Sequence, residues 1–204
     1  MRSLLVLLLI VLCSVRGSAQ DSDKTAALER QVYQLERRIA RLEAYVRSLP
    51  QPEPSPELKK MMGYAQLRMA LDNKTFSREE LNHIEKLYQS AAQDLGTPAS
   101  RKLLETVVSE FPKSNRAGCS QLYIARYYTS GEERERILKD CIARFGDCYY
   151  GDGTQVAPFA LFTLARYYAE AGKPEKAKDL YSQIRKDYSD AVEHTGLLLV
   201  SLIE

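Results

Sequence analysis

Apolar residues between positions 25 and 49 recur with a period of seven. The first heptad position holds Thr25, Val32, Ile39 and Val46, and the fourth holds Leu28, Leu35, Leu42 and Leu49. A lone helix would leave this stripe in water, and ordering each residue costs about 1 to 2 kcal/mol. The pattern therefore predicts an oligomerising coiled coil over residues 20–49. The alternative is a helix that folds back on its own domain.

Charges beside the stripe predict that the helices of the coil run parallel. Glutamates fill the fifth heptad position, and Arg38 at the seventh can reach Glu43 of a parallel neighbour. β-branched residues at the first position with leucine at the fourth favour two strands. Segment 38–43 also resembles the RhxxhE motif of short trimeric coils, so we expect a trimer in preference to a dimer. The residues expected to mediate self-association are Leu28, Val32, Leu35, Arg38, Ile39, Leu42, Glu43, Val46 and Leu49.

Four prolines fall within seven residues after the heptads, at 50, 52, 54 and 56. Proline cannot continue a helix and extends the chain, so residues 50–56 are predicted to form a semi-rigid linker. Beyond the linker, capping residues and prolines separate stretches of helical periodicity, and no stretch alternates as a strand does. The expected helices are 57–72, 78–95, 98–111, 115–129, 131–145, 156–171, 174–187 and 190–203. The sequence thus predicts an all-α fold with a helical domain over residues 57–204.

Two segments of this domain resemble each other and indicate an internal repeat. Residues 123–128 read YIARYY, and residues 163–168, 40 positions later, read TLARYY. Capping boxes are expected at Ser77 with Glu80 and at Ser130 with Glu133. Because repeated helical hairpins stack on their neighbours, we expect an α-α superhelix. Its last helix, 190–203, is almost wholly apolar, and we expect its burial within the domain in preference to a contact with another chain.

The first 19 residues are predicted to be a cleaved secretory signal peptide. A short basic start precedes ten apolar residues, and small residues lead to Ala19 at the expected cleavage site. The apolar run is about half the length that a membrane-spanning helix requires, so we expect no stable membrane span. Cys13 offers a second interpretation, a lipid-anchored protein, but Leu12 stands where a lipoprotein signal has a small residue. We therefore expect an exported protein that is cleaved after Ala19.

Charge and motif content exclude several classes of function. The chain has 29 basic and 27 acidic side chains, and loss of Arg2 and Arg16 with the leader leaves 27 of each. This balance argues against a nucleic-acid partner. The chain has two histidines, His83 and His194, and lacks HExxH, CxxC, GxSxG and glycine-rich phosphate motifs. We therefore expect no metal site, no cofactor and no catalytic activity.

Export would permit disulfides among the three cysteines beyond the leader, Cys119, Cys141 and Cys148. Three is an odd number, so at least one is free or pairs with another chain. Cys119 and Cys141 lie equally far from a turn near Ser130, at one level of a helical hairpin, which favours a bridge between them over the other pairs. An equally good interpretation is that all three are small apolar residues in a packed helix pair.

Residues 158–191 resemble the tetratricopeptide repeat, a 34-residue helical hairpin. Its packing positions are matched by Leu164, Ala165, Tyr168, Gly172, Ala177, Tyr181 and Ile184. The resemblance is looser for residues 81–114, and residues 118–148 depart from the motif. Such arrays bind peptides or partner helices in a groove lined by the first helix of each pair, and the resemblance implies groove positions at Leu122, Arg126, Phe162 and Arg166. Two arginines beside apolar faces would suit an acidic or C-terminal carboxylate segment.

The order of signal peptide, short coil, proline linker and helical repeats resembles the periplasmic Tol-Pal-associated cell-division coordinator family. The resemblance implies a non-catalytic periplasmic adaptor that binds envelope proteins and couples outer-membrane constriction to peptidoglycan synthesis. The alternative is a lipid-anchored scaffold similar to the tetratricopeptide lipoprotein of outer-membrane β-barrel assembly. A third class, a helical peptidoglycan hydrolase, would need an acid or nucleophile constellation that the sequence does not show.

Overall fold

The computed structural model describes residues 19–48 and 53–203, and the chain divides into two compact units, Met1–Glu53 and Pro54–Glu204. Eight α-helices are found among the described residues, which confirms the predicted all-α fold, and the seven helices of the second unit pack mainly against their neighbours in sequence. Residues 1–18 of the expected signal peptide, Leu49 and residues 50–52 of the proline linker fall outside the described residues, as does the side chain of Val46.

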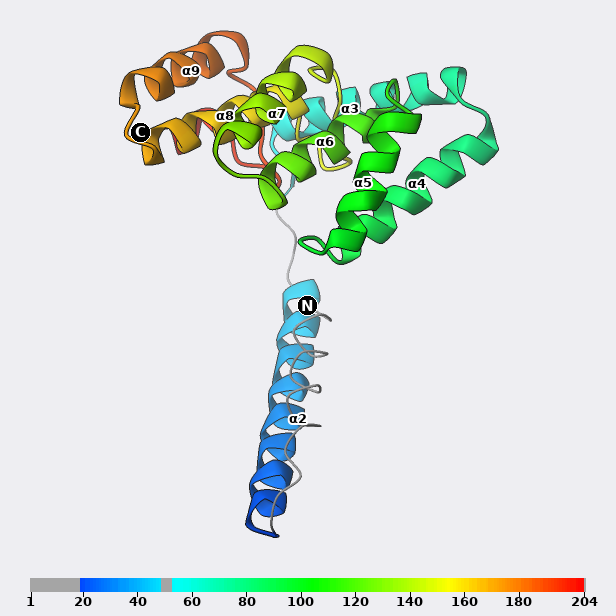
Figure 1. Ribbon diagram of the computed structural model, residues 1–204, viewed down its shortest axis with the longest axis vertical. Coiled ribbons are helices and arrows are strands. Elements are labelled where there is room, and N and C mark those ends of the chain that lie inside the picture. The colour runs from blue at the N-terminus through cyan, green and yellow to red at the C-terminus, as the bar shows by residue number, and fades with distance from the viewer. Residues whose placement is uncertain (1–18, 49–52, 204) are drawn as a thin grey trace. The chain divides into compact units, whose positions relative to one another are not determined.

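The part of the first unit that the structure describes is formed mainly by one uninterrupted helix, α2 (Ala19–Ser48), of 30 residues (Figure 1). At 1.5 Å per residue it is about 45 Å long. Four apolar heptad residues whose side chains are described are between 49% and 62% exposed: Leu28, Leu35, Ile39 and Leu42. The apolar stripe is therefore open to solvent in the single chain, and self-association through it stays a prediction.

The second unit begins with a long helix, α3, and continues as three helical hairpins. Its helices are α3 (Pro56–Thr75), α4 (Arg78–Gln93), α5 (Pro98–Glu110), α6 (Asn115–Tyr127), α7 (Gly131–Arg144), α8 (Val156–Glu170) and α9 (Pro174–Asp187). Local chemistry explains where they start, because Ser55 and Thr97 accept hydrogen bonds from the first turns of α3 and α5, each with proline at the start. Ser77 and Glu80 form the predicted capping box at the start of α4.

The hairpins α4–α5, α6–α7 and α8–α9 follow one another along the unit (Figure 1). The first helices of successive hairpins also touch, α4 against α6 and α6 against α8, and α3 contacts both α4 and α6. This packing is consistent with a helical repeat. Fully buried aliphatic side chains fill the spaces between the helices: Leu104, Leu122, Leu138, Leu161, Leu164 and Ile184.

A loop between α7 and α8 interrupts the regular spacing of the hairpins. Tyr149 and Gln155 form an isolated antiparallel bridge, and the Tyr150 N–H donates to the Thr154 carbonyl at 2.8 Å. The loop begins against α6 at Gly118, where an added Cβ would lie 2.6 Å from the Cβ of Cys148. Residue 118 therefore has to be glycine for the loop to pack this closely.

The prediction of a helix at 190–203 is wrong. Val192 and Leu198 instead form an isolated antiparallel bridge around a turn at Gly196, whose φ of 85° belongs to the left-handed region, and a short 3-10 helix, η1 (Leu199–Leu202), follows. Non-helical φ at a glycine breaks the helical pattern that the apolar run suggested. Val192 and Leu199 are fully buried, so the expected burial of this segment within its unit is confirmed for them.

The expected capping box at Ser130 is also wrong. Ser130 precedes α7, but its side chain makes no capping hydrogen bond. The next residue, Gly131, has a φ of 57°, so the chain enters α7 with a geometry that differs from that of a regular N-terminus. The backbone carbonyl of Ser130 still accepts from the N–H of Arg134 at 3.3 Å, so the helix starts where the sequence predicted.

Candidate functional site

A pocket of about 170 Å³ lies between α6, α7 and α8, and we call it the arginine pocket. Its lining residues are Arg126 from α6, Arg134 from α7, and Phe159, Phe162, Thr163, Arg166, Tyr167 and Glu170 from α8. Each of the six residues of α8 has another of the six three or four positions away along the chain, so they share one face of that helix. The pocket thus combines three guanidinium groups with aromatic rings and one carboxylate.

Arg126 is the central cation of the arginine pocket. Its guanidinium carbon lies 4.8 Å from the centre of the Phe159 ring and 5.4 Å from that of Tyr127. Both contacts are within the range of a cation–π interaction. In the part of the chain that the structure describes, no carboxylate lies within ion-pair distance of this guanidinium. Arg126 therefore keeps its capacity to bind a carboxylate from another molecule.

The other two arginines of the pocket are also weakly engaged. The Nε of Arg134 donates to the backbone carbonyl of Thr129 at 2.8 Å, which holds the side chain in place without neutralising it. Arg166 lies 3.7 Å from Glu170 in a pair whose side chains are 63% and 69% exposed. Such exposed pairs contribute little because water and salt screen them. The arginine pocket consequently has a surplus of positive charge.

Three of the four groove positions implied by the sequence meet in this pocket, namely Arg126, Phe162 and Arg166. Leu122 does not, because it is fully buried in the core, where α6 is enclosed by its neighbouring helices. Sequence reasoning missed Phe159 and Tyr167, although their spacing from Phe162 and Arg166 places them on the same helical face. It also missed Arg134, which no local pattern marks because it belongs to a different helix.

A second pocket, of about 370 Å³, lies between α7, Tyr167 and the turn before α9. Its lining residues are Glu132, Glu135, Arg136, Lys139, Tyr167 and Lys173. Glu135 accepts hydrogen bonds from Lys139 at 2.6 Å and from the hydroxyl of Tyr168 at 2.7 Å. These two bonds lower the pKa of Glu135, so its carboxylate is charged and already occupied.

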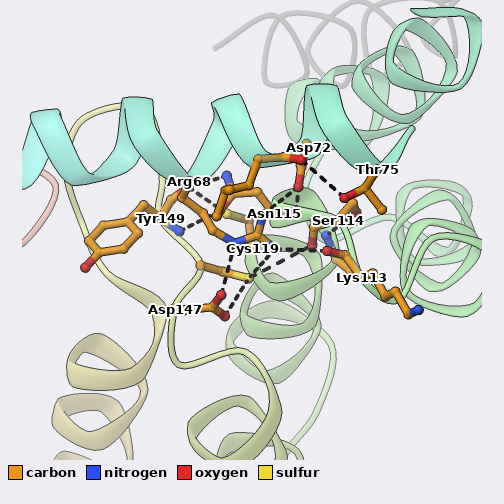
Figure 2. A network of polar contacts seen from close by, with 12 residues as sticks. Arg68, Asp72, Thr75, Lys113, Ser114, Asn115, Cys119, Asp147 and Tyr149 are labelled. Carbon is orange, nitrogen blue, oxygen red and sulfur yellow. Dashed lines mark hydrogen bonds and ion pairs between the residues drawn. The ribbon is translucent and has the colours of Figure 1, made fainter. Parts of the chain in front are cut away.

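A buried polar network, shown in Figure 2, joins α3 to α6 and to the loop after α7. The guanidinium of Arg68 contacts Asp72 at 2.5 Å, Asp147 at 3.2 Å and the carbonyl of Lys113 at 2.9 Å. The side-chain amide of Asn115 pairs with both backbone groups of Tyr149, each at 2.7 Å. Because its charges are paired internally, this network is a structural support for the helices and not a free binding site.

The three cysteines of the second unit are free thiols and all are buried. The Cys119–Cys141 bridge is thus not formed in the structure, and its formation after export stays a prediction. Burial raises the pKa of Cys119 and of Cys141, and it raises that of Cys148 to about 12 although Arg68 acts in the opposite direction. Thiols of this kind are protonated at neutral pH and are poor nucleophiles.

His194 joins the C-terminal segment to the loop after α7. Its Nδ1 lies 2.8 Å from an oxygen of Asp152. Its ring makes edge-to-face contacts with the rings of Tyr150 and Phe159, with centroids 4.7 and 4.9 Å apart. Burial acts to raise the pKa of Asp152, but hydrogen bonds from His194 and the Thr154 N–H outweigh it and lower that pKa. Within the described residues no group of three potential metal ligands is found.

None of the helices described is both long enough and apolar enough to span a membrane. No family model, no curated protein and no solved structure matches this chain.

Proposed function

We propose that this protein is a non-catalytic, exported adaptor of the periplasm that binds an acidic segment of another envelope protein in the arginine pocket. The observation that carries the proposal is Arg126, a guanidinium that lies over Phe159 with no carboxylate partner among the described residues. Guanidinium groups form forked, charge-assisted hydrogen bonds with carboxylates. An acidic side chain or a C-terminal carboxylate would therefore fit beside Arg126.

The aromatic residues of the pocket support a peptide partner in particular. Phe162 is nearly buried and Tyr167 is half-buried, so they offer an apolar surface next to the charges. A peptide residue with an apolar side chain would pack there while a neighbouring carboxylate meets the arginines. Small anions would contact the guanidinium groups alone and would gain no affinity from the aromatic rings.

The exposed stripe on α2 supports an oligomeric form of this adaptor. Copies that associate in parallel through α2 would cover Leu28, Leu35, Ile39 and Leu42, with a trimer favoured over a dimer. Several pockets on one oligomer would bind a multivalent or clustered partner more tightly than one pocket does. Coordination of cell division in the envelope, of the Tol-Pal type, is the process that the domain order suggests.

Peptide binding tests the proposal directly. A fluorescein-labelled peptide with one glutamate next to a phenylalanine should bind the purified chain, and an isosteric glutamine peptide should bind at least tenfold more weakly. Arg126→Glu with Arg166→Glu should abolish binding with little change in thermal stability. The matched control is Lys178→Glu with Lys186→Glu on the exposed surface of α9, which changes the charge equally outside the pocket. Equal binding by both double variants would remove the proposal.

The processed N-terminus distinguishes the adaptor from a lipid-anchored scaffold. Mass spectrometry of protein recovered from a Gram-negative periplasm should find an unmodified chain that starts at Gln20. A chain that starts at an acylated Cys13 would support the scaffold instead. Both residues lie outside the part of the chain whose side chains are described, so this choice depends on the sequence alone.

A further inference from the structure

The second pocket continues the arginine pocket on the other side of Tyr167. Tyr167 lines both pockets, and α7 contributes Arg134 to one and Arg136 to the other. An extended ligand that occupies the arginine pocket can therefore pass over one aromatic residue and reach the second pocket.

The two pockets together form a basic surface on a chain whose overall charge is close to neutral. Six cationic side chains line them, three in each pocket: Arg126, Arg134, Arg166, Arg136, Lys139 and Lys173. Only three carboxylates accompany these cations, and one of them, Glu135, is already hydrogen-bonded to Lys139 and Tyr168. The net charge of the lining is therefore positive.

Two cations of the second pocket are open to a ligand. Arg136 and Lys173 are exposed, and neither makes an ion pair with a carboxylate in the described ranges. The ammonium of Lys173 lies 5.8 Å from the centre of the Tyr168 ring, beside the pocket, and its charge helps to lower the pKa of Glu135 without forming an ion pair with it. Lys139, by contrast, is bound to Glu135 at 2.6 Å.

We infer that the second pocket is a second anion-binding subsite, and that the partner is an extended acidic peptide with carboxylates on both sides of an apolar residue that packs on Tyr167. The inference rests on the proposed function, because it adds a subsite to the arginine pocket. Arg136 and Lys173 bind the second carboxylate, while Glu135 stays bound to Lys139 and to the hydroxyl of Tyr168. The subsite selects for a peptide with acidic residues on both sides of the apolar residue over a peptide with a single acidic residue.

A peptide fits this surface better than a nucleic acid does. Phosphate backbones are held by long tracks of positive charge, and the chain as a whole lacks the excess of basic residues that such binding requires. Here the cations occur in two clusters separated by one aromatic side chain, a spacing that suits alternating acidic and apolar residues. Opposite charges at such exposed positions should also make binding sensitive to salt.

Two labelled peptides separate the subsite from the arginine pocket. One carries a single glutamate beside a phenylalanine, and the other adds two glutamates on the far side of the phenylalanine, after a spacer of two to five residues. We expect the second peptide to bind about five- to tenfold more tightly at its best spacer length, because it gains a further charge-assisted contact. Fluorescence anisotropy of the purified chain measures both affinities.

Variants of the second pocket test which residues cause the gain in affinity for the longer peptide. Arg136→Gln with Lys173→Gln should remove the gain and leave binding of the single-glutamate peptide unchanged within twofold. The matched control, Lys178→Gln with Lys186→Gln, should keep the gain, since these lysines are exposed on α9 outside both pockets. Circular dichroism of each variant verifies that the helical content is intact.

Four outcomes would overturn the inference. If the added glutamates give no gain at any spacer, or if the gain survives Arg136→Gln with Lys173→Gln, the second subsite does not exist while the arginine pocket stands. If single-stranded oligonucleotides bind as tightly as the acidic peptide, the partner is not a peptide. If neither peptide binds, the proposed function fails together with the subsite.

Discussion

The buried carboxylate of Asp72, on α3, accepts a hydrogen bond of 2.8 Å from the backbone N–H of Asn115, the first residue of α6. A carboxylate at this place satisfies an N–H that the helix itself leaves unpaired and lies at the positive end of the helix dipole. The other oxygen of Asp72 contacts Arg68 at 2.5 Å. One side chain of α3 thereby connects that helix to the start of the central hairpin.

We predict that Asp72→Ala lowers the free energy of unfolding of the chain by about 3 kcal/mol, because it leaves a buried N–H and a largely buried guanidinium without their partner. Asp147→Ala is the matched control, since Asp147 contacts the same arginine but its side chain is 74% exposed. The control should cost less than about 1 kcal/mol. Urea unfolding followed by circular dichroism measures both, and equal losses would contradict the assigned role of Asp72.

The close contact of Gly118 with Cys148 gives a second prediction. Gly118→Ala would place a methyl group 2.7 Å from the sulfur of Cys148 and 2.9 Å from the Cβ of Phe145, so we expect a loss of about 2 kcal/mol in the free energy of unfolding. Gly63→Ala, in the middle of α3 with open space around it, should instead stabilise the chain by about 0.5 to 1 kcal/mol. Urea unfolding of each variant measures these changes. If Gly118→Ala leaves the free energy of unfolding unchanged, the loop packs less tightly than described.

Self-association through α2 is tested by two neighbouring positions. Ile39→Lys puts a charge into the apolar stripe and should convert the oligomer to a single subunit, because burial of such a residue contributes roughly 1.5 to 3 kcal/mol in each copy. Ala40→Lys adds the same charge at the next residue, which the heptad places outside the stripe, and should leave the oligomer intact. Sedimentation equilibrium at micromolar concentration measures both. A wild-type chain that sediments as one subunit would refute the coiled coil.

The burial of the thiols predicts that they react slowly with thiol reagents at neutral pH. Because burial raises the pKa of Cys119, Cys141 and Cys148, their reactive thiolates form only at alkaline pH, and Ellman's reagent should not modify the native, reduced Cys13→Ser chain at pH 8. In urea, all three should react at once in a Cys13→Ser background. Ser109→Cys, at an exposed site on α5, is the positive control and should react in the native state. Protein purified from the periplasm that shows one thiol in urea instead of three contains a disulfide.

Local sequence determined the helices and their limits to a large extent. Seven of the eight helices predicted between residues 57 and 203 form, with ends within three residues of the expected ones, because serine, threonine and proline act on the few residues next to them. The helix expected at 190–203 failed since its apolar composition suits burial in any conformation. Only the burial of Val192 and Leu199, together with the turn at Gly196, selects the observed bridge, turn and 3-10 helix.

The candidate site was only partly accessible from sequence. Helical spacing placed Phe162 and Arg166 on one face of α8, and the repeated segment indicated Arg126 on α6. Leu122 was predicted to line the groove but lies in the core, because the local sequence does not reveal which helices enclose a side chain. Arg134 joins the pocket only when α7 packs between the two helices, a long-range contact that no local pattern contains.

The sequence by itself determined that the chain is helical, that α2 carries an apolar stripe and that the second unit contains related hairpins, because periodicity and capping act over a few residues. Tertiary structure alone decided that Asp72 meets Asn115 across 43 positions, that the loop at Cys148 packs on Gly118, and that three arginines from three helices share one pocket. Such relationships depend on which helix faces lie together, and that choice is made by the packing of the whole unit.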